Sequence, residues 1–247
     1  MTPNPIRKVL STLKSSSVRF LLSGGQACIL YGAAEFSRDA DVVVLLSDEN
    51  LDALRQALSE LDAEQLYVPA LGPDVLRRGH ACHFRCRRPE ADGIRLDVMS
   101  VLRGCDPFPA LYARRMTVDL PGLGDLPVLS LRDLVQSKKT QRDKDWGHIR
   151  RLVEVDYLAR RREATDEAVA WWLAESRTPE HLIELAAAHP EAAARAASRP
   201  WLTGAVDQGA EAVERELLDE ERRIRAEDRA YWQPLREELE RMRREAR

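Results

Sequence analysis

Two aspartates, Asp39 and Asp41, stand one residue apart at the start of the apolar run "ADVVVLL". Alternate residues of an extended strand face the same side, so both carboxylates can reach one divalent cation. A solvated strand end or a helix cap would explain such a pair on its own. A charge beside a buried strand is costly unless it is compensated, however, and this favours metal ligands.

Two further features stand in a suitable order around this pair. The strand-like "VRFLLS" ends in Ser23, Gly24 and Gly25, where a helix is expected to begin, and a glycine pair lets backbone N–H groups approach a phosphate. Downstream, Asp97 lies inside the strand-like "IRLDVMS". A third carboxylate on a neighbouring strand would complete a site for two Mg²⁺ ions that hold a triphosphate and activate an acceptor hydroxyl.

The segment "LSGGQACILYGAAEFSRDADVVV" resembles the opening of a nucleotidyltransferase-superfamily domain: a glycine pair, a helix, and Arg-Asp-x-Asp on the next strand. The chain is most similar to AbiEii-type and minimal nucleotidyltransferases, many of which belong to toxin–antitoxin or phage-defence systems. "IRLDVMS" matches the third-carboxylate strand, and "LPVLSLRDLVQSKKTQRDKDWGHIRRL" matches the helical segment that follows. The resemblance covers roughly residues 15 to 155. Many active members have Gly-Ser after the first strand, where this chain has Gly25.

The resemblance implies a role for each matching residue. Asp39, Asp41 and Asp97 would bind two Mg²⁺ ions, and Asp97 would also help to activate the acceptor. The resemblance also implies five residues that would contact the nucleotide: Ser23, Gly24, Gly25, Lys138 and Arg142. Of these, Lys138 would also be catalytic. A solvated basic helix face is the alternative for Lys138. Asp145 would orient one of these bases or cap a helix.

Five arginines and no acid lie between residues 75 and 89, on the arm of an expected hairpin that leads to Asp97. We expect this arginine segment to contact the phosphates of an RNA acceptor or of the nucleotide. Its members are Arg77, Arg78, Arg85, Arg87 and Arg88. A charged strand edge that resists aggregation is the alternative. The same stretch contains Cys82, His83 and Cys86, which suggest a zinc site only weakly, because Cys82 and Cys86 lie too far apart on an extended strand.

Elements along the chain divide it into two parts. Helix-like and strand-like segments alternate in the first part, whereas Ala, Glu and Arg dominate after Thr165 and strand signals disappear. We predict an α+β (mixed α/β) fold: a polymerase-beta-like nucleotidyltransferase core with a mixed sheet over residues 1–160, and an all-helical C-terminal region over residues 161–247. A long charged helix, or two helices broken near Pro234, should end the chain.

The whole-chain composition restricts the classes of function. The chain has 247 residues, a formal net charge of −3 and 44% hydrophobic residues, which excludes a globally basic nucleic-acid binder. It shows neither an apolar run long enough for a membrane span nor a signal-peptide pattern, so a cytoplasmic location is expected. Four cysteines are too few for a disulfide scaffold at this length.

We therefore expect an NTP-dependent nucleotidyltransferase that moves a nucleoside monophosphate to a hydroxyl of RNA (such as tRNA) or protein, as a toxin or a phage-defence enzyme. Two alternatives remain open. One is a catalytically weak module that binds nucleotide or a partner protein, in the manner of an antitoxin. The other is a transferase acting on a small molecule of the aminoglycoside type, although the arginine segment favours a nucleic acid over a small cation.

Overall fold

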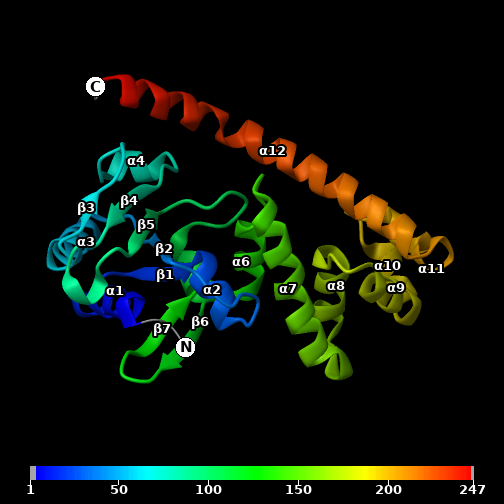
Figure 1. Ribbon diagram of the computed structural model, residues 1–247. Helices are drawn as coiled ribbons and strands as arrows, with labels where there is room; N and C mark the ends of the chain where they lie inside the picture. The colour runs from blue at the N-terminus through cyan, green and yellow to red at the C-terminus, as the bar shows by residue number, and fades with distance from the viewer. Residues whose placement is uncertain (1–3, 246–247) are drawn as a thin grey trace. The chain divides into compact units, whose positions relative to one another are not determined.

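The computed structural model describes residues 4–245 and divides them into two compact units (Figure 1). The first unit contains the described residues up to Leu30, the stretch Ala34–Ser137 and the end of the chain from Trp232. The second unit contains Tyr31–Ala33 and Lys138–Tyr231. The first unit contains the whole sheet, and the second is helical.

The first unit is built on one seven-stranded mixed sheet with the strand order β3-β4-β5-β2-β1-β7-β6. Its strands are β1 (Phe20–Ser23), β2 (Asp39–Val44), β3 (Glu64–Gln65), β4 (Cys82–Arg85), β5 (Arg95–Met99), β6 (Met116–Leu120) and β7 (Gly124–Val128). The β2–β5 and β1–β7 pairs are parallel, and the other neighbours are antiparallel. The mixed α/β class predicted from the sequence is confirmed.

The centre of this sheet is apolar on both faces beyond the aspartates. Val42, Val43 and Val44 are fully buried, as the uninterrupted apolar run predicts. The helix α1 (Asn4–Ser15) contacts β2 and turns the apolar stripe of Ile6, Val9, Leu10 and Leu13 into the core. Strand β2 is thereby held rigidly at the place where its first residues carry the two carboxylates.

Helices of the first unit connect and cover the strands. They are α2 (Gly24–Leu30), α3 (Asp48–Glu60), α4 (Pro73–Arg77), the short η1 (Pro89–Ala91), α5 (Phe108–Ala113) and α6 (Leu131–Ser137). Ser47 caps α3 and Ser130 caps α6 through their hydroxyl oxygens, which accept hydrogen bonds from backbone N–H groups. Helix α6 ends at Ser137.

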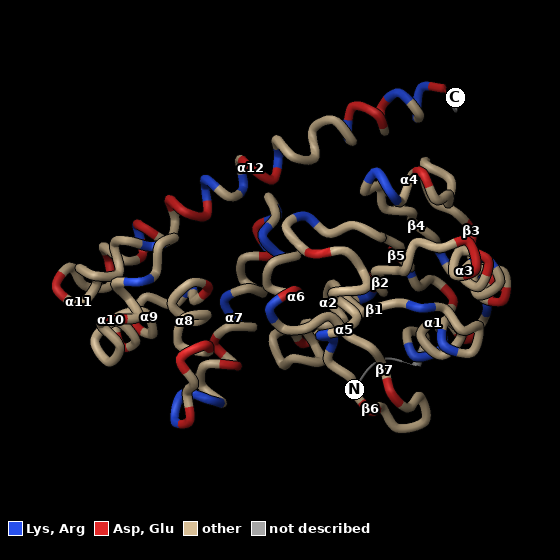
Figure 2. Tube along the Cα trace, turned by 180° about the vertical axis from the view of Figure 1, so that it is seen from behind, with Lys and Arg blue, Asp and Glu red and all other residues tan. Residues whose placement is uncertain are grey.

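Helices of the second unit follow one another with short connections. They are α7 (Asp143–Arg160), η2 (Arg161–Glu163), α8 (Asp166–Glu175), α9 (Pro179–Ala188), α10 (Pro190–Arg195), η3 (Pro200–Gly204), α11 (Ala205–Gln208) and α12 (Ala210–Glu245), whose end lies in the first unit. Pro234 lies inside α12 without interrupting it, since a proline removes one helical hydrogen bond while those on either side persist. Figure 2 shows acidic and basic residues alternating along this helix. None of the described helices is long and apolar enough to cross a membrane.

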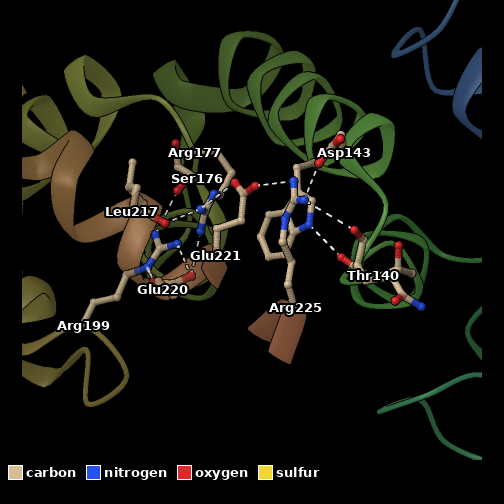
Figure 3. Close-up of polar contacts among 11 residues, drawn as sticks. Thr140, Asp143, Ser176, Arg177, Arg199, Leu217, Glu220, Glu221 and Arg225 are labelled. Atoms are coloured by element: carbon tan, nitrogen blue, oxygen red, sulfur yellow. Dashed lines mark hydrogen bonds and ion pairs between the residues drawn. The ribbon is translucent and has the colours of Figure 1, made fainter. Parts of the chain in front are cut away.

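Buried ion pairs connect α12 to the rest of the second unit (Figure 3). Glu220 accepts hydrogen bonds from the guanidinium groups of Arg177, at 2.8 Å, and Arg199, at 2.8 and 3.0 Å. The Arg199 side chain is only 1% exposed, and it also donates to the carbonyl oxygens of Leu173 and Ser176. Because a buried cation requires a partner, Glu220 is the residue on which this packing depends.

Candidate functional site

The predicted aspartates lie on two neighbouring parallel strands of the sheet. Asp41 on β2 is the direct cross-strand partner of Asp97 on β5, and Asp39 is the partner of Arg95. Directly paired residues face the same side of a sheet, as do alternate residues of one strand. The three carboxylates therefore share one face and one end of the β2–β5 pair, which is the arrangement that the sequence predicts.

The glycine pair packs directly against this face. Gly24 has a φ of +62°, and a Cβ atom there would lie 1.8 Å from Oδ2 of Asp41. A Cβ atom on Gly25 would lie 2.5 Å from Oγ of Ser37. The Ser23 hydroxyl is buried and donates a 3.1 Å hydrogen bond to the backbone oxygen of Asp41. It therefore stabilises the pairing of β1 with β2. Only glycine at residue 24 allows the backbone to come this close to the carboxylate.

Asp97 is held by two basic side chains on its own face. Arg95 donates to it in a two-pronged arrangement, with Nε 2.7 Å from Oδ1 and Nη2 2.8 Å from Oδ2. Nδ1 of His83, the cross-strand partner of Asp97 on β4, lies 2.8 Å from Oδ1 and 3.1 Å from the Nη2 atom of Arg95. Both carboxylate oxygens are therefore occupied by donors.

These contacts determine the charge of Asp97. Burial raises its pKa, but the hydrogen bonds and positive charges of His83 and Arg95 outweigh that effect and keep the pKa below its usual value. The pKa of Arg95 is raised, chiefly by its hydrogen bonds to Asp97 and further by the nearby charges of Asp39 and Asp41. Asp97 is consequently an ionised carboxylate whose positive partner is already present in the chain.

The chemistry of these donors fits a hard divalent cation, because Mg²⁺ prefers carboxylate oxygens. As the side chains lie, however, no three His, Cys, Asp or Glu residues within 4–245 converge closely enough to hold a metal ion together. Both oxygens of Asp97 instead accept hydrogen bonds from Arg95. A metal on all three aspartates would require Arg95 to release Asp97.

Lys138 and Arg142 belong to the second unit, where both contact Asp145. Asp145 is fully buried and accepts from Lys138 Nζ at 3.1 Å, Arg142 Nε at 2.8 Å and the Thr140 hydroxyl at 2.7 Å. Lys138 is buried as well, so the solvated-face alternative is wrong for this residue. Asp145 lies inside α7 rather than before it, and it orients the two bases instead of capping the helix.

The arginine segment is less positive than its sequence suggests, because acids from other elements lie beside it. Arg77 pairs with Asp74, Arg78 with Glu238, Arg87 with Glu64, and Arg88 with Glu90. Arg85 is exposed and makes no ion pair within the described part of the chain. Strand pairing sets Arg85 beside Arg95, on the face that carries the aspartates.

The cysteines near His83 are core residues. Cys82 and Cys86 are fully buried, and burial raises the pKa of each thiol to about 11. His83, on the opposite face of β4 from Cys82, contacts Asp97 instead. The weak zinc interpretation thus gains no support from the described residues.

Sequence reasoning missed two members of the site, Arg95 and His83 as partners of Asp97. A signal for Arg95 was present in "RLDVM", because residues 95 and 97 of one strand face the same side. No local pattern revealed His83, since its contact depends on the pairing of β4 with β5.

No protein-family model matches this chain, and no curated protein matches its sequence. Two solved structures are distantly similar. The "putative nucleotidyltransferase from H. pylori" shares 13% identity over 92% of this chain and 94% of its own, with a TM-score of 0.41. JHP933 from Helicobacter pylori shares 12% identity over 89% and 93% of the two chains, with a TM-score of 0.38.

Proposed function

We propose that this protein is a metal-dependent nucleotidyltransferase that moves a nucleoside monophosphate from an NTP to an acceptor hydroxyl. The observation that carries the proposal is the register of β2 with β5, which sets Asp39, Asp41 and Asp97 on one face beside the Gly24 backbone. An acidic cluster beside the half-buried backbone of a glycine at a helix start suits metal-bound phosphates.

In the proposed reaction, the acceptor oxygen forms a bond to the α-phosphorus, the bond from that phosphorus to the bridging oxygen breaks, and pyrophosphate leaves. Bound Mg²⁺ would supply positive charge to the phosphates and lower the pKa of the acceptor hydroxyl. Asp39 and Asp41 would hold the metal, and Gly24 would let the triphosphate approach the backbone. Once Arg95 has released Asp97, the Asp97 carboxylate would bind metal and help to take the proton of the acceptor hydroxyl. The roles of Lys138 and Arg142 toward the nucleotide stay predictions.

For the acceptor, we propose RNA, bound through the arginine segment. Most ion pairs of this segment are exposed: the Arg77 and Asp74 side chains are 63% and 77% exposed. Exposed pairs contribute only about 0–1 kcal/mol, so an RNA phosphate can replace the carboxylate at little cost. A toxin role follows if the modified RNA is required for growth.

A second candidate is a binding module that has the fold without turnover. The bidentate Arg95–Asp97 pair favours this candidate, because it satisfies Asp97 without a metal. The two candidates differ in whether substituting the aspartates abolishes a chemical reaction.

The deciding experiment is incubation of the full chain with each labelled NTP, Mg²⁺ and total RNA, and separately with cell protein. The Asp39→Asn/Asp41→Asn variant tests the site. Its matched control is Asp119→Asn/Asp125→Asn, which removes two exposed, directly paired aspartates from β6 and β7 of the same sheet.

We expect labelled RNA from the wild type and the control, and none from the site variant. Label that persists in the site variant would refute the mechanism. Label on protein alone would redirect the acceptor, and no transfer to any acceptor would favour the binding module. Growth arrest on expression, relieved by the site variant, would support the toxin role.

A further inference from the structure

The face that carries the three aspartates also carries a fixed positive charge. Arg95 stands two residues before Asp97 on β5 and directly opposite Asp39 on β2. Its guanidinium donates to both oxygens of Asp97 at 2.7 and 2.8 Å. Arg95 thus lies among the carboxylates that are the expected metal ligands.

The guanidinium and a divalent cation compete for the same carboxylate. A two-pronged arginine–carboxylate pair is among the stronger hydrogen-bonded contacts in proteins, and it uses the carboxylate face on which a metal would bind. A metal ion seated beside a guanidinium would also be repelled by it. A metal ion on Asp97 and the Arg95 guanidinium would therefore each weaken the binding of the other.

Burial explains why the chain needs a cation here at all. The Asp97 side chain is 12% exposed, and an ionised carboxylate at that depth is costly without a positive partner. Arg95 supplies this partner through its two hydrogen bonds to Asp97. The Arg95 side chain is itself 36% exposed, so it can move toward solvent without leaving a buried cation behind.

We propose that Arg95 is an internal counter-cation which a divalent metal must displace from Asp97, and that it thereby regulates metal loading of the site. This inference rests on the proposed nucleotidyltransferase function. The free protein binds metal weakly, because each metal must break the Arg95–Asp97 pair. A nucleotide that arrives with the metal offers phosphate oxygens to the released guanidinium, so nucleotide and metal bind cooperatively.

The test measures Mn²⁺ binding to the full chain, by titration calorimetry and by the electron paramagnetic resonance signal of free Mn²⁺, with no NTP or acceptor present. Arg95→Gln removes the competing charge. Arg85→Gln is the matched control, because Arg85 is the cross-strand partner of Arg95 on β4 and makes no ion pair among the described residues. Arg95→Lys retains the charge but loses the two-pronged geometry.

We expect Arg95→Gln to bind Mn²⁺ about tenfold more tightly than the wild type or more, and Arg85→Gln to change the affinity less than about twofold. Arg95→Lys should fall between them. Adding a non-hydrolysable NTP analogue should raise the Mn²⁺ affinity of the wild type more than that of Arg95→Gln.

Thermal unfolding in EDTA and in Mg²⁺ shows whether each variant is folded. Arg95→Gln should melt lower than the wild type in EDTA and gain more from Mg²⁺, since a ligand that binds only the folded state stabilises it. Unchanged or weaker Mn²⁺ binding by a folded Arg95→Gln would overturn the displacement proposal. If binding still depended on Asp39 and Asp41, the proposed function would survive that result. No Mn²⁺ binding by any variant would overturn both.

Discussion

The carboxylate of Asp41 occupies the space that a side chain at residue 24 would need. A Cβ atom on Gly24 would lie 1.8 Å from Oδ2 and 2.3 Å from Cγ of Asp41, and the backbone at Gly24 has a φ of +62°. Strand β2 and the backbone at Gly24 are therefore fitted to each other, so that a larger residue at position 24 would displace Asp41.

Gly24→Ala should consequently displace Asp41 and destabilise the fold. The strain of a left-handed alanine and the clash together should cost more than about 2 kcal/mol in the free energy of unfolding. Gly93→Ala is the control, because Gly93 has a φ of +78° with no atom within 4 Å of an added Cβ, so it should cost only about 1 kcal/mol. Urea unfolding measures both, and equal losses would contradict the fitted arrangement.

The Lys138–Asp145 pair gives a second prediction. Asp145 is fully buried and the Lys138 side chain is 7% exposed, so Asp145→Ala leaves an unpartnered buried cation and should cost about 3–5 kcal/mol. Asp143→Ala, at a 94% exposed position in the same first helical turn, should cost less than about 1 kcal/mol.

The double variant Lys138→Met/Asp145→Leu separates a buried charge from a packing defect. Replacing both partners with apolar side chains should recover much of the stability lost in Asp145→Ala. If the double variant is less stable than the single one, the interpretation of Asp145 as the partner of Lys138 fails. Chemical denaturation of the full chain gives all of these values.

The sequence-based prediction succeeds where the pattern is local. The apolar run after Asp41 predicts a buried strand, and the alternation in "RLDVM" predicts that Asp97 faces away from Leu96 and Val98. The parallel pairing of β2 with β5, in which Asp41 lies opposite Asp97, then brings the carboxylates to one face.

The contacts that change the interpretation of the site join residues distant in sequence. Glu64 and Glu238 neutralise Arg87 and Arg78, which the count of charges between residues 75 and 89 did not include. His83 approaches Asp97 only through the β4–β5 register. Charge near a segment in sequence is a poor measure of charge near it in space, and for that reason the arginine segment looked more basic than it is.

Acid should unfold the protein partly through Glu220. Burial raises the pKa of Glu220, but Arg199 and Arg177 outweigh that effect and hold the pKa below its usual value of 4.5. A carboxyl whose folded pKa is depressed contributes its full stability above the unfolded value. That contribution is lost as the pH falls below about 4.5 and through the folded pKa.

Glu220→Gln should therefore be less stable than the wild type by about 3 kcal/mol at pH 7 and should lose less stability on acidification, since glutamine does not titrate. The exposed Glu216→Gln on the same helix is the control, and its stability curve should follow that of the wild type. Unfolding free energies between pH 3 and pH 7 provide the measurement. If Glu220→Gln and the wild type lost the same unfolding free energy between pH 7 and pH 3, Glu220 would not be a cause of acid unfolding.

The cysteines give a prediction that also tests the zinc interpretation. Burial raises the pKa of both Cys82 and Cys86 to about 11, so roughly one thiol in a thousand is ionised at pH 8. Cys105 is only half-buried, and none of the four cysteines forms a disulfide. Iodoacetamide should thus label Cys105 of the native protein first and label Cys82 and Cys86 slowly, while urea should expose all four. Peptide mass spectrometry gives the order of labelling.

Added Zn²⁺ should leave the labelling of Cys82 and Cys86 unchanged, whereas protection of both thiols by Zn²⁺ and release by EDTA would establish them as metal ligands.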